Sequence, residues 1–221
     1  MRFAIRGVIY DLDDLMVNSY PLHMEAMLKI FEKYGKDMGN LPSQMVKNMV
    51  GRRIKDILTD LIGFFELDVD FEKFSKERSD IFLALVKSKI KPMPGLLKSL
   101  RLFTENNFKI ALGSSGTKKY INIVLKKFSI KDYFNVIVTG DDVKNGKPNP
   151  ETYLVSAQKL GLKPQNTLVL EDATNGIESA KVAGCWCIAV KNKNTPPQDL
   201  SRADIIVKSL EEIDLDLINS L

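Results

Sequence analysis

Cysteine, histidine and long apolar runs are all scarce in this 221-residue sequence, and each scarcity excludes a class of protein. No apolar run approaches the roughly 20 residues that a transmembrane helix needs, so we expect no membrane partner. The amino terminus, MRFAIRGVIYDLDD, lacks the apolar region and small-residue cleavage site of a signal peptide. The two cysteines, Cys185 and Cys187, are too few for a zinc site, and we interpret them as buried reduced thiols. These features predict a cytoplasmic protein.

The charge of the chain is also modest. The formal net charge is +4, and lysines are spread along stretches such as LKKFSIKDY rather than gathered in a block. No segment resembles an arm that binds nucleic acid, so we expect no nucleic-acid partner. With 44% apolar and 27% charged residues, the chain is able to bury the core of one large domain, or of a domain with a smaller insert.

Six short apolar runs, bounded by turn residues, predict buried strands. They cover residues 3–11, 108–115, 134–140, 167–172, 185–190 and 203–208. Helical patterns separate most of them, at residues 94–107, 118–128, 149–161, 176–184 and 209–221. This alternation predicts an α/β fold: a doubly wound, Rossmann-like core in which helices cover both faces of a parallel sheet.

One long segment breaks this alternation. Between the first two strands, amphipathic helical patterns cover residues 21–35, 42–65 and 69–90. We therefore predict an α/β core over 1–17 and 92–221, with an inserted helical cap over 18–91. Pro92 and Pro94 follow the insert and stiffen the connection between the two parts.

Polar side chains follow four of the predicted strands, where the carboxyl ends of parallel strands meet at one edge of a sheet. In chain order they are Asp11 with Asp13, Ser114 with Ser115, Lys147, and Glu171 with Asp172. Four carboxylates at one edge repel one another, which implies a divalent cation. Oxygen ligands together with a substrate phosphate are typical of Mg²⁺, which we expect as the cofactor.

The same groups suit phosphoryl transfer. An aspartate between Mg²⁺ and a phosphate is able to act as a nucleophile, and a second carboxyl nearby could protonate the leaving oxygen. Lys147 and Ser114 would then hold the phosphoryl oxygens. Each of these four polar segments, taken alone, is also explained as an ordinary turn or helix cap. The hypothesis therefore depends on all four segments occurring in this order, each after its own strand.

Four segments, YDLDD, LGSS, NGKPNPETY and VLEDATNGIESAK, resemble the motifs of the haloacid dehalogenase superfamily. The resemblance covers nearly the whole chain, and it implies the role of each residue. Asp11 would be the nucleophile and a metal ligand, and Asp13 the general acid and base, with its backbone carbonyl on the metal. Ser114, Ser115 and Lys147 would bind the phosphoryl group. Asp172 would be a metal ligand, with Glu171 on the metal directly or through water.

The insert resembles the cap of the branch that includes β-phosphoglucomutase and many sugar-phosphate phosphatases. This resemblance places His23, the only histidine, near the site, and we interpret Arg52 as a substrate contact. Ile54 stands where the mutase carries an arginine that grips a distal phosphate. Asp14 stands where many members have glycine, and it would either be solvated or cap the following turn.

We therefore expect a Mg²⁺-dependent phosphatase acting on a small phosphorylated metabolite, with a sugar phosphate favoured, through an aspartyl-phosphate intermediate. The first alternative is a phosphotransferase of the β-phosphoglucomutase type. The second is a non-catalytic binding protein that kept the fold, because fold alone does not establish activity. We expect a monomer or a weak dimer.

Overall fold

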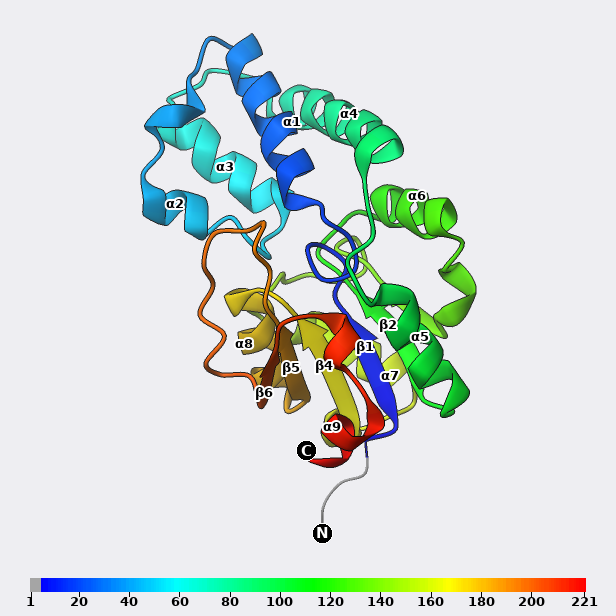
Figure 1. The fold of residues 1–221 in the computed structure, drawn as a ribbon. Coiled ribbons are helices and arrows are strands. Elements are labelled where there is room, and N and C mark those ends of the chain that lie inside the picture. The colour runs from blue at the N-terminus through cyan, green and yellow to red at the C-terminus, as the bar shows by residue number, and fades with distance from the viewer. Residues whose placement is uncertain (1–4) are drawn as a thin grey trace.

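A computed structural model describes residues 5–221 and contains a six-stranded parallel sheet with helices on both faces (Figure 1). The strands are β1 (Gly7–Tyr10), β2 (Lys109–Gly113), β3 (Val136–Val138), β4 (Thr167–Glu171), β5 (Trp186–Val190) and β6 (Ile205–Val207). Their order in the sheet is β3-β2-β1-β4-β5-β6. All six predicted strands are confirmed, although residues 3 and 4 of the first prediction lie outside the described residues. The doubly wound fold class is confirmed with them.

The strands are short and buried on both faces, as their apolar sequences predict. Val8 and Tyr10 of β1 face one apolar core, and Ile9 faces the other, because side chains alternate along a strand. The first core is covered by α5 (Leu96–Glu105), α6 (Lys118–Phe128) and α9 (Leu215–Asn219), and the second by α7 (Glu151–Lys159) and α8 (Thr174–Ala183). Cys185 and Cys187 are both buried and unpaired in the second core, as predicted.

Short 3-10 turns complete the core of the protein. They are η2 (Lys131–Tyr133), η3 (Pro164–Asn166) and η4 (Leu210–Glu212). The single helical pattern predicted over 209–221 is wrong in one detail, since η4 and α9 are separate. The chain is extended at Ile213 and Asp214, and the Asp214 carboxylate accepts a hydrogen bond from the Leu217 N–H at 2.8 Å, which starts a new helix.

Four helices gather beyond the carboxyl end of the sheet, at the end of the molecule opposite the C-terminus (Figure 1). They are α1 (Tyr20–Lys33), α2 (Ser43–Lys47), α3 (Ile54–Phe64) and α4 (Phe71–Lys89), with the turn η1 (Met38–Asn40). We call α1 to α4 the cap. Phe31, Leu58 and Phe74 lie in an apolar core of its own. The domain boundaries at 17/18 and 91/92 stay a prediction.

The helix predicted over 42–65 is broken in the middle. Residues 48–53 form a turn between α2 and α3, and Gly51 adopts a φ of +75°. That left-handed conformation suits glycine and interrupts a helix. The break brings backbone carbonyls of the cap down to the sheet edge, where they contact the candidate site.

The two connections between the core and the cap lie side by side. The Asn18 N–H donates to the Lys91 carbonyl at 3.0 Å, and the Met93 N–H donates to the Met16 carbonyl at 2.9 Å. This pairing ties the start of the cap to its end. Among residues 5–221, none of the helices combines the length and apolar character needed to cross a membrane.

Candidate active site

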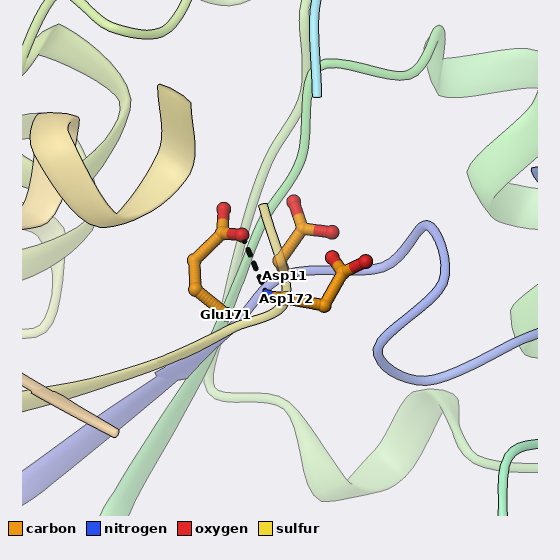
Figure 2. Close-up of side chains that lie close together, drawn as sticks. All are labelled: Asp11, Glu171 and Asp172. Atoms are coloured by element: carbon orange, nitrogen blue, oxygen red, sulfur yellow. Dashed lines mark hydrogen bonds between the residues drawn. The ribbon is translucent and has the colours of Figure 1, made fainter. Parts of the chain in front are cut away.

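Three buried carboxylates meet where the strand order of the sheet reverses. Asp11 directly follows β1, Glu171 is the last residue of β4, and Asp172 comes next. Because β1 and β4 are paired neighbours, one oxygen from each carboxylate lies within 4.8 Å of the others (Figure 2). Open α/β sheets bind ligands at this switch point, beyond the carboxyl ends of the strands.

The electrostatics of the cluster favour a bound cation. Burial raises the pKa of Asp11 well above its usual value, and burial together with the Glu171 charge does the same for Asp172. The Asp172 Oδ2 atom is buried and has no hydrogen-bond partner among the described residues. A buried carboxylate oxygen without a partner is costly unless a cation occupies the space beside it. The donor set, hard oxygens only, fits Mg²⁺.

Lys147 lies between two of these carboxylates. Its Nζ donates to Asp11 Oδ1 at 2.5 Å and to Glu171 Oε1 at 2.6 Å, and its side chain is 1% exposed. Burial opposes the lysine charge, but the two carboxylates outweigh that cost and raise the pKa of Lys147 above its usual value. The lysine therefore carries a fixed positive charge against the predicted nucleophile.

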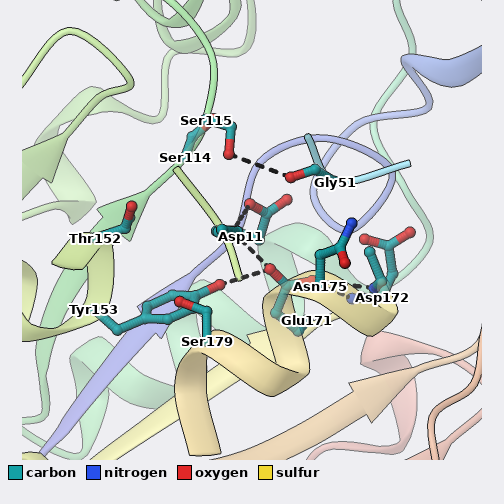
Figure 3. Close-up of polar contacts among 12 residues, drawn as sticks. Asp11, Gly51, Ser114, Ser115, Thr152, Tyr153, Glu171, Asp172, Asn175 and Ser179 are labelled. Carbon is teal, nitrogen blue, oxygen red and sulfur yellow. Dashed lines mark hydrogen bonds and ion pairs between the residues drawn. The ribbon is translucent and has the colours of Figure 1, made fainter. Parts of the chain in front are cut away.

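Glu171 differs from Asp172 because its oxygens are already fully used. Its Oε1 also accepts from the Tyr153 hydroxyl at 2.6 Å (Figure 3), and its Oε2 accepts from the N–H groups of Asp172 and Ala173. A Cβ at Gly176 would overlap the Glu171 carboxylate, so only glycine fits there. These contacts indicate that Glu171 chiefly orients Lys147 and the strand end, and that Asp11 and Asp172 keep the freer oxygens.

Asp13 is not part of the carboxylate cluster. The chain turns after Leu12, and the Asp13 Oδ1 atom accepts a hydrogen bond from the Tyr120 hydroxyl at 2.7 Å. His23 Nε2 lies 3.6 Å from the same oxygen. Burial opposes the charge of Asp13, but hydrogen bonds from His23 and from neighbouring hydroxyls outweigh it and lower the pKa of Asp13. Asp11 and Asp13 are thus separated into two environments, which the spacing alone could not determine.

Arg78 of α4 completes a chain of contacts to Asp13. Its Nη2 lies 2.6 Å from His23 Nδ1, and its guanidinium stacks on the Phe82 ring at 4.8 Å. Arg78 is 1% exposed, and burial lowers its pKa to about 9. Burial also lowers the pKa of His23, so the imidazole favours its neutral form.

Asp14 caps the first helix of the cap. Its Oδ1 accepts from the N–H groups of Ser19 and Tyr20 at 3.0 and 2.9 Å, and its φ is +64°. Glycine adopts this left-handed φ readily, and aspartate is among the residues that tolerate it. Of the two roles considered for Asp14, the structure favours the cap, because the side chain is buried rather than solvated.

The turn at 48–53 of the cap contacts two loops, after β2 and β3, and the first turn of α8. Ser115 Oγ donates to the Gly51 carbonyl at 3.4 Å (Figure 3). Asn175 Nδ2 donates to the Val50 carbonyl at 3.2 Å. The Arg53 guanidinium donates to the carbonyls of Val143 and Lys144, each at 2.9 Å. We call residues 48–53 the docking turn.

The remaining predicted residues lie in or beside the same site. Ser114 is buried, and its Oγ accepts from the Gly116 N–H at 2.9 Å. Arg52 lines a cavity of about 310 Å³ between the cap and the sheet edge, where its Nη1 donates to Asp60 at 2.9 Å. Asp11, Asp13 and His23 line that cavity as well.

Sequence reasoning did not select Tyr153, Tyr120, Arg78 or Arg53. Tyr153 and Tyr120 occupy buried faces of helices, where tyrosine is ordinary core. Arg78 did leave a signal, because it lies four residues from both Phe74 and Phe82 on the apolar stripe of α4. A charge on an apolar stripe marks a buried ion or a site.

Together the fold and the site define a capped α/β enzyme with a buried carboxylate–lysine centre at the carboxyl end of a parallel sheet. The family model of haloacid dehalogenase-like hydrolases matches residues 8–190. The chain belongs to this family, which confirms the resemblance inferred from its four motifs.

Curated relatives and solved structures agree with this assignment. The chain is 32% identical over 184 residues to the phosphorylated carbohydrates phosphatase of Thermotoga maritima, covering 81% of this chain and 82% of the relative. It is 30% identical over 209 residues to hexitol phosphatase A of Escherichia coli, covering 94% and 93%. The crystal structure of β-phosphoglucomutase from Clostridium difficile superposes with a TM-score of 0.84, at 26% identity over 98% of this chain and 96% of that one. The relatives named as phosphatases confirm the expectation of a phosphatase.

Proposed function

We propose that the protein hydrolyses small phosphorylated carbohydrates through an aspartyl phosphate on Asp11, with Mg²⁺ as cofactor. One observation carries the proposal above the others. The carboxylate of Asp11 is paired with Lys147 beside Asp172, and Asp13 is held apart from them by Tyr120 and the cap. A nucleophile and a separate acid–base group are the two parts that hydrolysis by double displacement needs.

The residues of the chain account for both steps. Asp11 attacks the phosphorus in line, the bond to the leaving oxygen breaks, and the phosphoryl group is transferred to the carboxylate. Lys147 balances the negative charge on the phosphoryl oxygens, and Ser114 and Ser115 hold them from the loop after β2. Asp13 gives a proton to the leaving oxygen, then takes one from a water that attacks the aspartyl phosphate.

Asp11 and Asp172 are the residues that would hold Mg²⁺, and the backbone carbonyl of Asp13 would be a further ligand. Glu171 lies beside them, with its oxygens already accepting hydrogen bonds. The bound ion supplies charge stabilisation to the phosphoryl oxygens during transfer. The partnerless Asp172 oxygen and the all-oxygen donor set support this choice of ion.

The cavity supports a small polar substrate. Its wall combines apolar cap side chains such as Met27 and Phe82 with the cations of Arg52 and Arg78. Two relatives at 32% and 30% identity are named as a phosphorylated carbohydrates phosphatase and a hexitol phosphatase. A sugar phosphate is therefore the substrate class that the proposal favours. A cytoplasmic location, a monomer or weak dimer and the absence of a nucleic-acid partner stay predictions.

A panel of phosphomonoesters tests the proposal directly. With Mg²⁺ we expect phosphate release from one or more sugar phosphates, and no release by an Asp11→Asn variant that keeps the thermal unfolding temperature of the wild type. Turnover by Asp11→Asn at the wild-type rate would contradict the nucleophile assignment.

The same panel separates hydrolysis from the mutase alternative. β-Glucose 1-phosphate is tested for conversion to glucose 6-phosphate alongside phosphate release. We expect release to dominate, because Ile54 replaces the arginine of the mutase and the curated relatives are named phosphatases. Fast isomerisation with little free phosphate would favour the mutase.

A further inference from the structure

Tyr120 is a buried tyrosine whose hydroxyl reaches the site from the core side. It is the third residue of α6 and is 3% exposed. Its hydroxyl donates to Asp13 Oδ1 at 2.7 Å, whereas the cap-side His23 Nε2 stands 3.6 Å from that oxygen. The tyrosine therefore makes the shorter of the two contacts to the carboxylate.

The ring of Tyr120 is fixed on several sides. The Thr117 hydroxyl accepts from the Tyr120 N–H at the start of α6. Phe82 of α4 packs edge-to-face on the Tyr120 ring at 5.0 Å between centroids, and His23 does so at 6.2 Å. A side chain locked by a helix cap and by aromatic packing keeps its hydroxyl at one point in space.

The shortest contact that holds the Asp13 carboxylate is the one from Tyr120, and the other groups that act on it are His23 and Ser19. Asp13 lies in the turn beyond β1, outside the sheet, and its side chain is 26% exposed toward the cavity. A short carboxylate on a turn has rotational freedom, and small displacements of a proton donor cost large factors in rate. The Tyr120 hydroxyl removes that freedom on the Oδ1 side and leaves the carboxylate facing the cavity.

We propose that Tyr120 is a positioning residue that aims the Asp13 carboxyl at the leaving oxygen. Tyr120 also lies where α6 of the core contacts α4 of the cap, so it links the cap to Asp13. Since Phe82 of the cap packs on the tyrosine ring, the packing of the cap on the core also fixes the hydrogen bond to Asp13. This inference rests on the proposed function, because it assigns Tyr120 to the proton transfer that the phosphatase needs.

The test uses Tyr120→Phe and two esters of similar shape, phenyl phosphate and 4-nitrophenyl phosphate, both with Mg²⁺. Phenolate is a poor leaving group and needs the proton from Asp13, whereas 4-nitrophenolate leaves as a stable anion. The value of kcat/KM covers only the steps through departure of the leaving group. We expect Tyr120→Phe to lower kcat/KM for phenyl phosphate by at least about 10-fold and for 4-nitrophenyl phosphate by less than about 3-fold.

The decisive quantity is the ratio of kcat/KM for phenyl phosphate to kcat/KM for 4-nitrophenyl phosphate. Partial unfolding of the variant would lower both values by the same factor, so a purely structural role leaves the ratio unchanged. Tyr34→Phe is the matched control, because the Tyr34 hydroxyl donates to Glu77 on the cap, and we expect both values to stay at wild-type level.

An unchanged ratio in Tyr120→Phe, with or without a loss of activity, would overturn the role of Tyr120 and leave the proposed function standing. A wild-type protein that hydrolyses neither these esters nor any sugar phosphate of the panel with Mg²⁺ would overturn the proposed function and the role of Tyr120 with it.

Discussion

Arg78 Nη2 lies 2.6 Å from His23 Nδ1, and this contact fixes the tautomer of the imidazole. Arginine has only donors, so Nδ1 must be the acceptor and the proton of the neutral ring must sit on Nε2. Nε2 is the atom that faces Asp13, at 3.6 Å from Oδ1. A buried arginine of the cap thus turns a histidine donor toward the predicted acid–base carboxylate.

The Arg78→Met variant should release this tautomer. Without the guanidinium, Nδ1 loses its donor and the ring is free to carry its proton on either nitrogen. Because the chain has one histidine, its ¹⁵N spectrum contains a single imidazole. We expect the Nε2–H form in the wild type and a mixture in Arg78→Met, with kcat lowered by about 10-fold. A wild-type ring protonated on Nδ1 would contradict the structure.

Replacement of Lys147 by methionine should destabilise the protein. The change leaves Asp11 and Glu171 buried without the cation between them, and removing one member of a buried ion pair costs about 3–5 kcal/mol. Urea denaturation measures the loss in free energy of unfolding. The matched control is Lys193→Met in an exposed loop, where we expect a change below about 0.5 kcal/mol. Equal stability of the two variants would contradict the buried pair.

Mg²⁺ should raise the thermal unfolding temperature. An ion that binds only the folded state stabilises it by about 2.7 kcal/mol at a concentration 100 times its dissociation constant. The readout needs no substrate, so it tests the site apart from activity. We expect the shift in the wild type and its loss in Asp172→Asn. This substitution removes the negative charge of the carboxylate that carries the partnerless oxygen. A shift of equal size in both proteins would place the ion elsewhere.

The Arg53→Ala variant should loosen the docking turn. It removes two hydrogen bonds, to the carbonyls of Val143 and Lys144, that join the cap to the loop before Lys147. We expect KM to rise several-fold, and limited proteolysis within residues 48–53 to become faster, because more of the cap is undocked. Lys47→Ala, an exposed residue at the end of α2, is the control that should behave as wild type.

The two thiols should be unreactive while the protein is folded. Burial raises the pKa of Cys185 to about 12 and holds that of Cys187 well above its usual value, so almost no thiolate forms near neutral pH. A disulfide reagent such as DTNB should label neither thiol at pH 8 and both in denaturant. Rapid labelling of the native protein would contradict their burial.

The sequence was sufficient to predict which residues meet at the ends of the strands. Asp11, Glu171 and Asp172 follow apolar runs, and the pairing of parallel strands brings such positions together without any detail of side-chain packing. All six strands were predictable as well, because residues buried on both faces of a sheet leave a strong local pattern in the sequence.

The parts that sequence could not supply depend on tertiary contacts. The environment of Asp13 differs from that of Asp11 because its carboxylate contacts Tyr120 of α6 and His23 of α1, two residues on other elements. The break of the 42–65 pattern at Gly51 follows from docking of the cap, since the local periodicity alone favours a continuous helix. Helix propensity is a weak guide where such contacts compete with it.

The central claim is that each turnover passes through an aspartyl phosphate on Asp11, and the stereochemistry at phosphorus tests it most directly. The substrate is a phosphorothioate monoester whose phosphorus is chiral, because it carries one sulfur atom and two different oxygen isotopes. It is hydrolysed in water labelled with a third oxygen isotope. Two in-line displacements, by Asp11 and then by water, predict that the product retains the configuration at phosphorus. Inversion would mean that water attacks the substrate directly, and it would contradict the account.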